Sequence, residues 1–378
     1  MAFVAGPRQT GKTTLAQNLS DKYLTWDNQK DRKSIIQGAD ETADYLDLNN
    51  LREKQIITAF DELHKYSKWK SFIKGFFDLY NDQTKSLVTG SARLNIFKKG
   101  GDSLMGRYFL YRMHPLSVAE LISQDLLDTE LRKPQSIGSE EWETLLTYGG
   151  FPEPFLKRNM RFYNRWRRMR TEQFFTEDVR DLTKIQEIAQ IQLLSDIIKS
   201  QVGQLLNYSN LATSVNVSQD TIKRWITTLG NLYYSFTIQP WHTNIKKSLI
   251  KQPKIFLWDW TMCSDVGARN ENFIASHLLK AVHFWTDSGL GNYDLFFLRD
   301  KMKREVDFLV TKDNIPWFIV EVKTSDTQLS PSLEFFQKQT KAKHAFQVTL
   351  NAPFVNKDCF THDTPIKVPA KTFLSQLV

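Results

Sequence analysis

The chain has 378 residues, of which 41% are hydrophobic and 24% charged, and its only cysteines are Cys263 and Cys359. This length allows two or three domains with buried cores, and so few cysteines exclude a disulfide framework. No apolar run is long enough to cross a bilayer, and a polar motif occupies the place of a signal peptide's apolar region, so we expect a cytoplasmic protein. The net charge of +8 is compatible with an anionic partner such as nucleic acid, but it is a weak signal.

The first motif is a phosphate-binding loop. It reads Gly6-Pro7-Arg8-Gln9-Thr10-Gly11-Lys12-Thr13 and fits the pattern G-x-x-x-x-G-K-[ST]. An apolar run at 2–5, shorter than a usual strand, precedes the loop, and an amphipathic helical pattern follows it from Thr14. Glycines let successive backbone N–H groups surround an anion at a helix N-terminus. We therefore expect residues 6–14 to bind a nucleotide, with Lys12 at the β- and γ-phosphates and Thr13 on Mg²⁺. The alternative is a glycine turn with a chance lysine.

The next predicted strand, 55–62, is mostly apolar and ends in Asp61 and Glu62, which is a Walker B pattern. In open α/β sheets ligands lie outside the carboxyl ends of the strands, so both acids are expected to face the phosphate loop. Asp61 would then hold the Mg²⁺ shell, and Glu62 would deprotonate the attacking water. The alternative is an acidic pair that caps a helix starting near Leu63.

A third predicted strand, 86–89, leads into Gly90 and Ser91. A small polar residue at this strand end can contact the γ-phosphate or the water, and Thr89 or Ser91 is the candidate for this sensor role. A plain strand-to-loop turn is the alternative.

Taken together, these segments resemble a family of bacterial and archaeal AAA+-like ATPases that carry a C-terminal region of unknown function. The resemblance rests on GPRQTGKTTL, FDELHKYSKWKSFIKGFFD, LVTGSARL and LMGRYFLYRMHPLSVAEL, in that order. It implies an α/β fold with a parallel P-loop sheet, and ATP with Mg²⁺ as cofactors. It also implies Arg107 as an arginine finger, acting in cis or from a neighbouring subunit of a homo-oligomer. A structural salt bridge is the alternative for Arg107. The family's segment before the loop, which helps hold adenine, is missing from this sequence.

The middle of the chain begins with a polar connection at 126–142 and a break at 148–154, which matches the family's GGFPE segment. A basic helix is predicted next, with an arginine stripe on one face. The stripe consists of Arg158, Arg161, Arg165 and Arg168. It could bind a DNA or RNA backbone, but a solvated or interdomain face is the more usual explanation of such a charge run.

The stretch 205–229 predicts a helix-turn-helix. A helix near 210–215, a turn at Asn216 and a Ser218 cap precede a second helix, 219–229, and a wing-like strand, 232–238. Residues facing DNA would be Gln219, Asp220, Lys223 and Arg224. Winged helices in ATPases also serve as docking modules, and the sequence does not distinguish the two roles.

The last third predicts a helix from Gly267 to about His283 and strands at 293–299, 305–311 and 316–323. Asp307, Glu321 and Lys323 form a D…E-x-K set similar to restriction-endonuclease-like, PD-(D/E)XK folds. Asp307 and Glu321, completed by Glu271, would bind Mg²⁺, and Lys323 would lower the pKa of the attacking water. Possible accessory residues on the following helix, 333–343, are Gln337 and Lys338.

The sequence thus predicts four regions: an ATPase domain at 1–125, a helical connection at 126–185, a winged helix at 186–250 and an α/β nuclease-like domain at 251–378. The leading hypothesis is a Mg²⁺-dependent ATPase that acts with nucleic acid. The alternative is a nucleotide-gated binding module whose last domain cuts nothing. A GTPase ranks below both, because no N/T-K-x-D motif follows Asp61.

Overall fold

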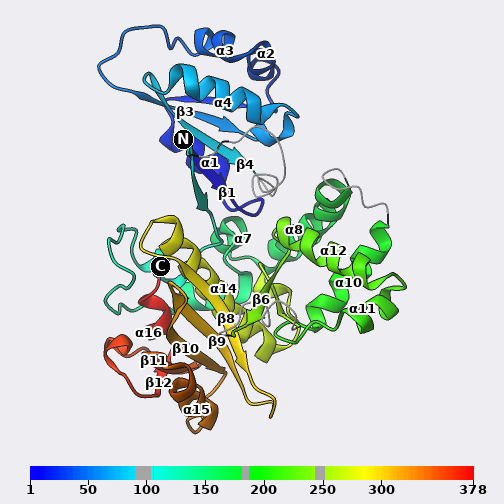
Figure 1. Ribbon diagram of the computed structural model, residues 1–378, viewed down its shortest axis with the longest axis vertical. Helices are drawn as coiled ribbons and strands as arrows, with labels where there is room; N and C mark the ends of the chain where they lie inside the picture. Colours follow the sequence, from blue (N-terminus) through cyan, green and yellow to red (C-terminus); the bar gives the residue numbers. More distant parts are fainter. Residues whose placement is uncertain (91–103, 105, 181–186, 243–251) are drawn as a thin grey trace. The chain divides into compact units, whose positions relative to one another are not determined.

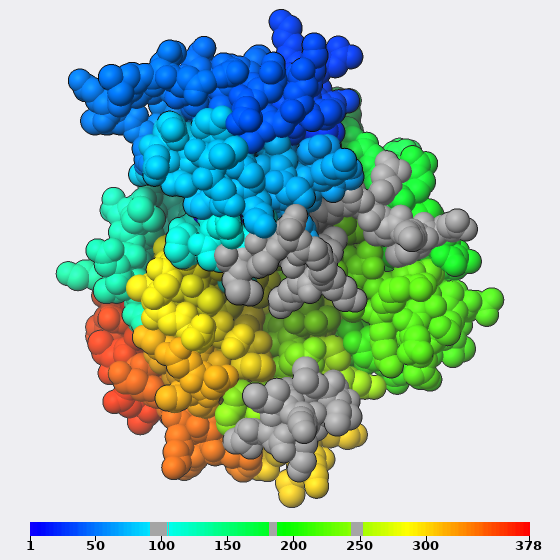
Figure 2. All heavy atoms as spheres, turned by 45° about the horizontal axis from the view of Figure 1, so that its top comes forward, coloured from blue at the N-terminus to red at the C-terminus, as the bar shows by residue number. Residues whose placement is uncertain are grey.

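A computed structural model of the chain describes residues 1–90, 104, 106–180, 187–242 and 252–378. These residues form two compact units (Figure 1). The first comprises Met1–His114 with Asn231–Tyr233, and the second comprises Pro115–Gly230 with Tyr234–Val378. Figure 2 draws all heavy atoms in the same colour sequence, with the remaining residues in grey.

The first unit alternates strands and helices. Its elements are β1 (Ala2–Ala5), α1 (Lys12–Leu19), β2 (Lys22–Thr25), α2 (Gln29–Gln37), α3 (Ala39–Tyr45), β3 (Ile56–Asp61), η1 (Leu63–Lys65), α4 (Trp69–Tyr80), β4 (Thr84–Gly90) and β5 (Phe109–Arg112).

All neighbouring strands of the first unit are parallel, and their order in the sheet is β2-β3-β4-β1-β5. The predicted parallel α/β sheet at the N-terminus is therefore confirmed. Because β4 lies between β1 and β3, the ends of these three strands meet at one edge of the sheet. This is the edge from which the phosphate loop and Asp61 emerge.

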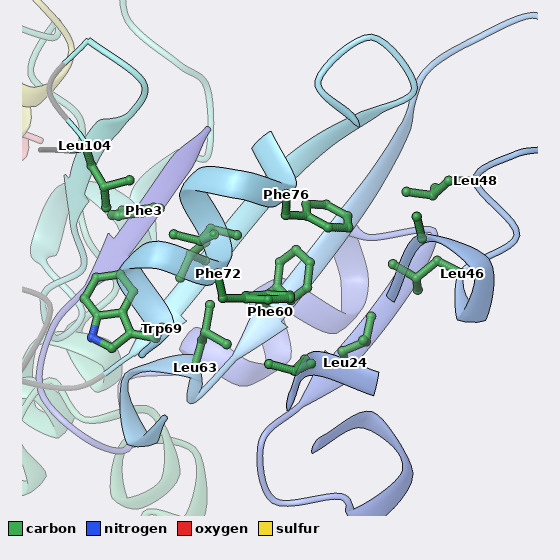
Figure 3. Packing of buried hydrophobic residues seen from close by; sticks show 14 of the residues in the cluster. Phe3, Leu24, Leu46, Leu48, Phe60, Leu63, Trp69, Phe72, Phe76 and Leu104 are labelled. Carbon is green, nitrogen blue, oxygen red and sulfur yellow. The ribbon is translucent and has the colours of Figure 1, made fainter. Parts of the chain in front are cut away.

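The core of this unit is aromatic. Phe60 of β3 is fully buried, and its ring centroid lies 5.8 Å from that of Phe72 and 5.0 Å from that of Phe76, both on α4 (Figure 3). Both contacts are edge-to-face, the geometry that aromatic quadrupoles favour. This packing holds α4 against the strand that ends in Asp61.

The second unit contains most of the helices. Its elements are α5 (Val118–Ile122), α6 (Ser139–Tyr148), α7 (Pro152–Lys157), α8 (Met160–Gln173), the π-helix η3 (Phe174–Val179), α10 (Ile188–Ser200), α11 (Tyr208–Val215), α12 (Gln219–Asn231), β6 (Ser235–Pro240), β7 (Lys254–Leu257), η4 (Trp260–Met262), α14 (Val266–Asp287), β8 (Tyr293–Arg299), β9 (Glu305–Lys312), β10 (Ile315–Lys323), α15 (Pro331–Thr340), β11 (His344–Thr349), η5 (Cys359–Thr361), β12 (Ile366–Pro369) and α16 (Ala370–Ser375).

The sheet of this unit has seven strands in the order β12-β11-β10-β9-β8-β6-β7. Side chains alternate along β10, as a strand requires. Ile319 packs with Leu333 and Phe336 of α15, whereas Phe318 packs against Phe360 and Phe373. Glu321, near the end of this strand, lies on the same face of the sheet as Ile319.

The segments predicted as separate middle and last domains form one compact unit. The reason is β6, which pairs antiparallel with β7 and parallel with β8 through Gln239 and Pro240. The predicted wing strand is thus part of the large sheet. The boundary between the units lies at His114 and Pro115, whereas the predicted ATPase domain extends to residue 125.

The predicted arginine stripe is broken at its first member. Arg158 has a positive φ of 45° between α7 and α8, and its guanidinium pairs with Glu140. Asn159 then caps α8 by accepting a hydrogen bond from the N–H of Phe162 at 2.9 Å. Only Arg161, Arg165 and Arg168 continue along the helix, all exposed.

None of the described helices has the length and apolar character needed to cross a membrane.

We expect the Phe60→Ala variant to destabilise the first unit by about 3–5 kcal/mol, because it leaves a cavity between β3 and α4. Calorimetric unfolding of the full chain measures this effect. Leu79→Ala is the control, since Leu79 lies on α4, the helix that packs against Phe60, but is 59% exposed. It should change the free energy of unfolding by no more than about 0.5 kcal/mol. Equal effects of the two substitutions would contradict the described core.

Candidate functional site

The phosphate loop connects β1 to α1 and depends on both of its glycines. A Cβ on Gly6 would lie 2.2 Å from the carbonyl oxygen of Met113, so only glycine fits beside this backbone. Gly11 has a φ of +96° and directly precedes Lys12, the first residue of α1. Gln9 also has a positive φ, 66°. The loop therefore has the tight curvature that turns backbone N–H groups towards an anion.

Within the loop, polar side chains bond to its own carbonyl groups. Lys12 is buried, and its ammonium donates to the carbonyl oxygens of Gly6 and Pro7. Thr10 donates to the same Pro7 carbonyl at 2.9 Å. Thr13 and Thr14 are exposed in the first turn of α1. These contacts hold the Lys12 ammonium at the loop, where its positive charge is available to phosphate groups.

Asp61 is the centre of the candidate nucleotide site. Its carboxylate accepts hydrogen bonds from the hydroxyls of Thr13 at 2.8 Å and Tyr23 at 2.7 Å, and from the Thr89 hydroxyl. These donors come from α1, β2 and β4, and Asp61 itself is only 4% exposed. Burial, followed by the hydrogen bond to Asp61, raises the pKa of the Tyr23 hydroxyl, which therefore remains a donor.

Three of the residues singled out in the sequence, Thr13, Asp61 and Thr89, thus lie in direct contact, and these residues fit a nucleotide with its Mg²⁺ ion. The fit follows from the donor set, because a carboxylate and a hydroxyl 2.8 Å apart are hard oxygen ligands of the kind Mg²⁺ prefers. Ser91 lies outside the described residues. Sequence reasoning missed Tyr23, and the only available signal was a tyrosine in the strand beside β3.

Glu62 follows Asp61 with a φ of 55°, an uncommon conformation for a residue with a side chain. Its carboxylate Oε2 lies 3.4 Å from the Lys65 ammonium and 3.7 Å from Nε2 of His64. The positive φ turns the chain sharply into η1, and the side chain bonds to this turn. The role of Glu62 as a general base stays a prediction.

Arg107 lies away from the phosphate loop of its own chain. Its guanidinium forms a two-pronged ion pair with Asp78 near the end of α4, at 2.8 and 3.2 Å. Its carbonyl accepts a hydrogen bond from the amino group of Met1, which precedes β1, whereas the loop follows β1. Arg107 thus makes the structural salt bridge given as its alternative, and its role as an arginine finger stays a prediction.

The second group of singled-out residues lies in the seven-stranded sheet and forms an acidic cluster. We define this cluster as the side chains of Glu271, Glu305, Asp307 and Glu321. Asp307 accepts a hydrogen bond from the N–H of Val322 at 2.8 Å, which joins β9 to β10. Glu321 pairs with Lys323 at 2.8 Å, as expected for residues two apart on one strand face.

A residue that the sequence did not single out lies among these acids. The ammonium of Lys254, at the start of β7, is 3.0 Å from Glu271, 2.6 Å from Glu305 and 3.6 Å from Asp307. Its side chain is 3% exposed. The available signal was a lysine adjoining the apolar run 255–257, because a buried charge needs an opposite partner.

Burial and neighbouring like charges raise the pKa values of carboxyl groups in the acidic cluster. Burial, then the neighbouring Asp307, raises the pKa of Glu271 to about 8 and that of Glu321 to about 7. Burial also raises the pKa of Asp307. For Lys254, burial favours the neutral form, but the surrounding carboxylates outweigh it and raise its pKa. The ammonium is therefore charged at neutral pH.

The predicted Mg²⁺ ligands Glu271, Asp307 and Glu321 do not fit a divalent ion in this arrangement. Two of them already face the Lys254 ammonium, and two unit charges 4 Å apart interact by about 4 kcal/mol at an effective dielectric constant of about 20. Across the described ranges, no three His, Cys, Asp or Glu side chains are grouped so that they could hold a metal ion. Oε2 of Glu321 is buried without a hydrogen-bond partner among the described residues.

The predicted accessory residues make structural contacts. Gln337 donates from Nε2 to the carbonyl oxygens of Ala342 and Asp363, at 3.2 and 3.0 Å. Lys338 pairs with Glu334 one helical turn away, at 2.6 Å. Gln337 thus fastens α15 to the chain that follows it, and its contacts give no support to a role at the acidic cluster.

Comparisons with known proteins agree with the first unit. Residues 1–122 match the model of an AAA domain family, whereas residues 139–271 and 266–361 match two domains of unknown function, DUF8612 and DUF4143. Uncharacterized proteins of Mycobacterium bovis and Mycobacterium tuberculosis are each 22% identical over 355 residues, covering 88% of this chain and 72% of their own length. The AAA match confirms the predicted likeness of the N-terminal region to AAA-type P-loop ATPases and supports ATP binding.

We expect Gly6→Ala to weaken ATP binding by about tenfold or more, because a clash with the Met113 carbonyl costs about 1–3 kcal/mol and must distort the loop. Titration calorimetry with ATP and Mg²⁺ measures the affinity. Gly75→Ala is the matched control, because nothing lies within 4 Å of a Cβ added at this position of α4. Its ATP affinity should equal that of the wild type. An unchanged affinity of Gly6→Ala would contradict the described loop.

Proposed function

We propose that the protein binds ATP with Mg²⁺ in its N-terminal unit, hydrolyses it, and uses this cycle to control a nucleic-acid-binding C-terminal unit. ATP binding and hydrolysis are supported by the hydrogen bonds of Asp61 with Thr13 and Thr89. These bonds bring the end of the phosphate loop together with the ends of β3 and β4. The AAA match over residues 1–122 supports the same reaction class.

In this proposal the chain's residues have distinct roles. The loop from Gly6 to Thr13 holds the phosphates through its backbone N–H groups, and Lys12 balances their charge. Thr13 and Asp61 hold the Mg²⁺ ion, which would neutralise charge on the phosphate oxygens. Thr89 orients the Asp61 carboxylate, and Glu62 orients and deprotonates the attacking water.

Nucleic-acid binding is supported by the order of elements in the second unit. Helices α10, α11 and α12 precede the antiparallel pair β6 and β7, and Leu205 between α10 and α11 bridges to Lys254 on β7. This order of helices followed by an antiparallel strand pair supports the proposed winged helix. On α12, Ile222 and Trp225 are buried, whereas Lys223 and Arg224 are exposed. The exposed face is thus the one that a major groove would meet.

A second candidate function is favoured by Lys254. In it, ATP switches the conformation of the protein and the nuclease-like domain only holds a partner, without cutting DNA or RNA. An ammonium between Glu271 and Asp307 supports this reading, because it takes the place that a catalytic metal would need.

We expect Lys12→Ala and Asp61→Asn each to lower ATP turnover by at least about 100-fold, since Lys12 balances the phosphate charge and Asp61 would hold the Mg²⁺ ion. Steady-state phosphate release with Mg²⁺ is the measurement. The exposed lysine of β4 provides the control, and Lys85→Ala should retain wild-type turnover. Equal turnover in wild type and Lys12→Ala would exclude the proposed ATPase.

A nuclease assay tests the second candidate function. Labelled DNA and RNA are incubated with the wild type, Asp307→Ala and Lys323→Ala, with Mg²⁺ or Mn²⁺ and with or without ATP. We expect none of the proteins to cleave either substrate, because the Lys254 ammonium lies among Glu271, Glu305 and Asp307, where a catalytic metal ion would have to bind. Cleavage by the wild type that is lost in both variants would instead show a working nuclease and refute the binding-module reading.

A further inference from the structure

We propose that Lys254 is the resident cation of the acidic cluster and stands in for the divalent ion of a D…E-x-K site. This inference rests on the proposed binding-module function and identifies what stabilises its nuclease-like domain. It predicts that the acidic cluster of the parent protein binds no divalent metal ion.

The first argument is geometry. An ammonium group has three N–H donors and no acceptor. Lys254 directs two of them to carboxylates on different elements, Glu271 of α14 at 3.0 Å and Glu305 of β9 at 2.6 Å, and Asp307 of β9 lies 3.6 Å from the same ammonium.

The second argument is that the backbone fixes this lysine in place. Lys254 pairs with Ile238 of β6, and its strand also bridges to Leu205. Gly203 nearby has a φ of +76°, and a Cβ there would lie 2.7 Å from Oε2 of Glu271. The chain thus leaves room for the carboxylate that Lys254 contacts. Lys254 belongs to the interior of the fold and does not reach in from the surface.

The third argument is that cationic side chains already occupy the positions beside these carboxylates. Every carboxylate of the acidic cluster has a cationic partner: Glu271 and Asp307 pair with Lys254, and Glu305 pairs with both Lys254 and Arg299. Glu321 pairs with Lys323. A divalent ion would have to displace at least one of these ammonium contacts. Oε2 of Glu321, which has no hydrogen-bond partner among the described residues, is the position where such an ion would first be detected.

The test is Mn²⁺ binding to the full chain without nucleotide, followed by electron paramagnetic resonance. Every protein carries Asp61→Asn, which removes the metal ligand of the phosphate loop. In this background we expect the Lys254→Met variant to gain one bound Mn²⁺ ion, because it frees carboxylates without changing side-chain length greatly. Adding Asp307→Asn should abolish the gain. The parent and the Lys254→Arg variant should bind no Mn²⁺, because both keep a cation among the acids.

Two results would overturn the inference. One is Mn²⁺ binding by the parent that is lost on Glu321→Gln or Asp307→Asn, which would place a metal in the cluster beside Lys254. The other is a folded Lys254→Met protein that gains no Mn²⁺ ion. Circular dichroism reports whether this variant folds. If it does not, the Lys254→Met variant that also carries Glu305→Gln has one buried charge fewer and replaces it in the titration.

The experiment is independent of ATP hydrolysis. Turnover is measured separately on the wild type and Lys254→Met, both with Asp61 intact. Absence of turnover in the wild type would refute the proposed ATPase and leave the Mn²⁺ result valid. Mn²⁺ binding by the parent at the acidic cluster would refute the role of Lys254 and leave the ATPase valid.

Discussion

The buried carboxylate of Asp61 is the interaction on which the nucleotide site depends. A charged group of this kind is stable inside a protein only when donors surround it. Here the donors are the hydroxyls of Thr13, Tyr23 and Thr89, which come from three elements around β3. The carboxylate therefore fixes the first turn of α1 against the ends of two strands. It does so through neutral groups, which leaves its negative charge available to a cation.

The buried carboxylates of the acidic cluster in the second unit also need donors around them, but here the donors are charged rather than neutral. These carboxylates pair with ammonium and guanidinium groups, chiefly with Lys254. Removing one member of such a buried network leaves an uncompensated charge, which is strongly destabilising. The two acidic sites thus differ in their partners. The side chains that donate to Asp61 are hydroxyls, whereas Asp307 faces an ammonium group.

Much of this could be predicted from the sequence, because local patterns determine it. The loop Gly6–Thr13, the strand before Asp61, the cap at Ser218 and the strand 293–299 follow from glycine spacing, apolar runs and capping chemistry. Long-range pairings could not be predicted. The partner of Arg107 is Asp78, 29 residues earlier, and Lys254 meets Asp307, 53 residues later in sequence number. Only the fold brings such residues together. Arg158 was misassigned for a local reason, since a left-handed residue separates α7 from α8.

The position of β6 affects how this protein could have evolved. Its edges are bonded to β7 on one side and β8 on the other, so the helix pair before it shares a continuous sheet with the acidic cluster. A recombination event that exchanged residues 186–250 alone would strip β6 of both neighbours and expose a strand edge prone to aggregation. Inheritance of α10, α11 and α12 together with the seven-stranded sheet as one block is therefore the expected pattern.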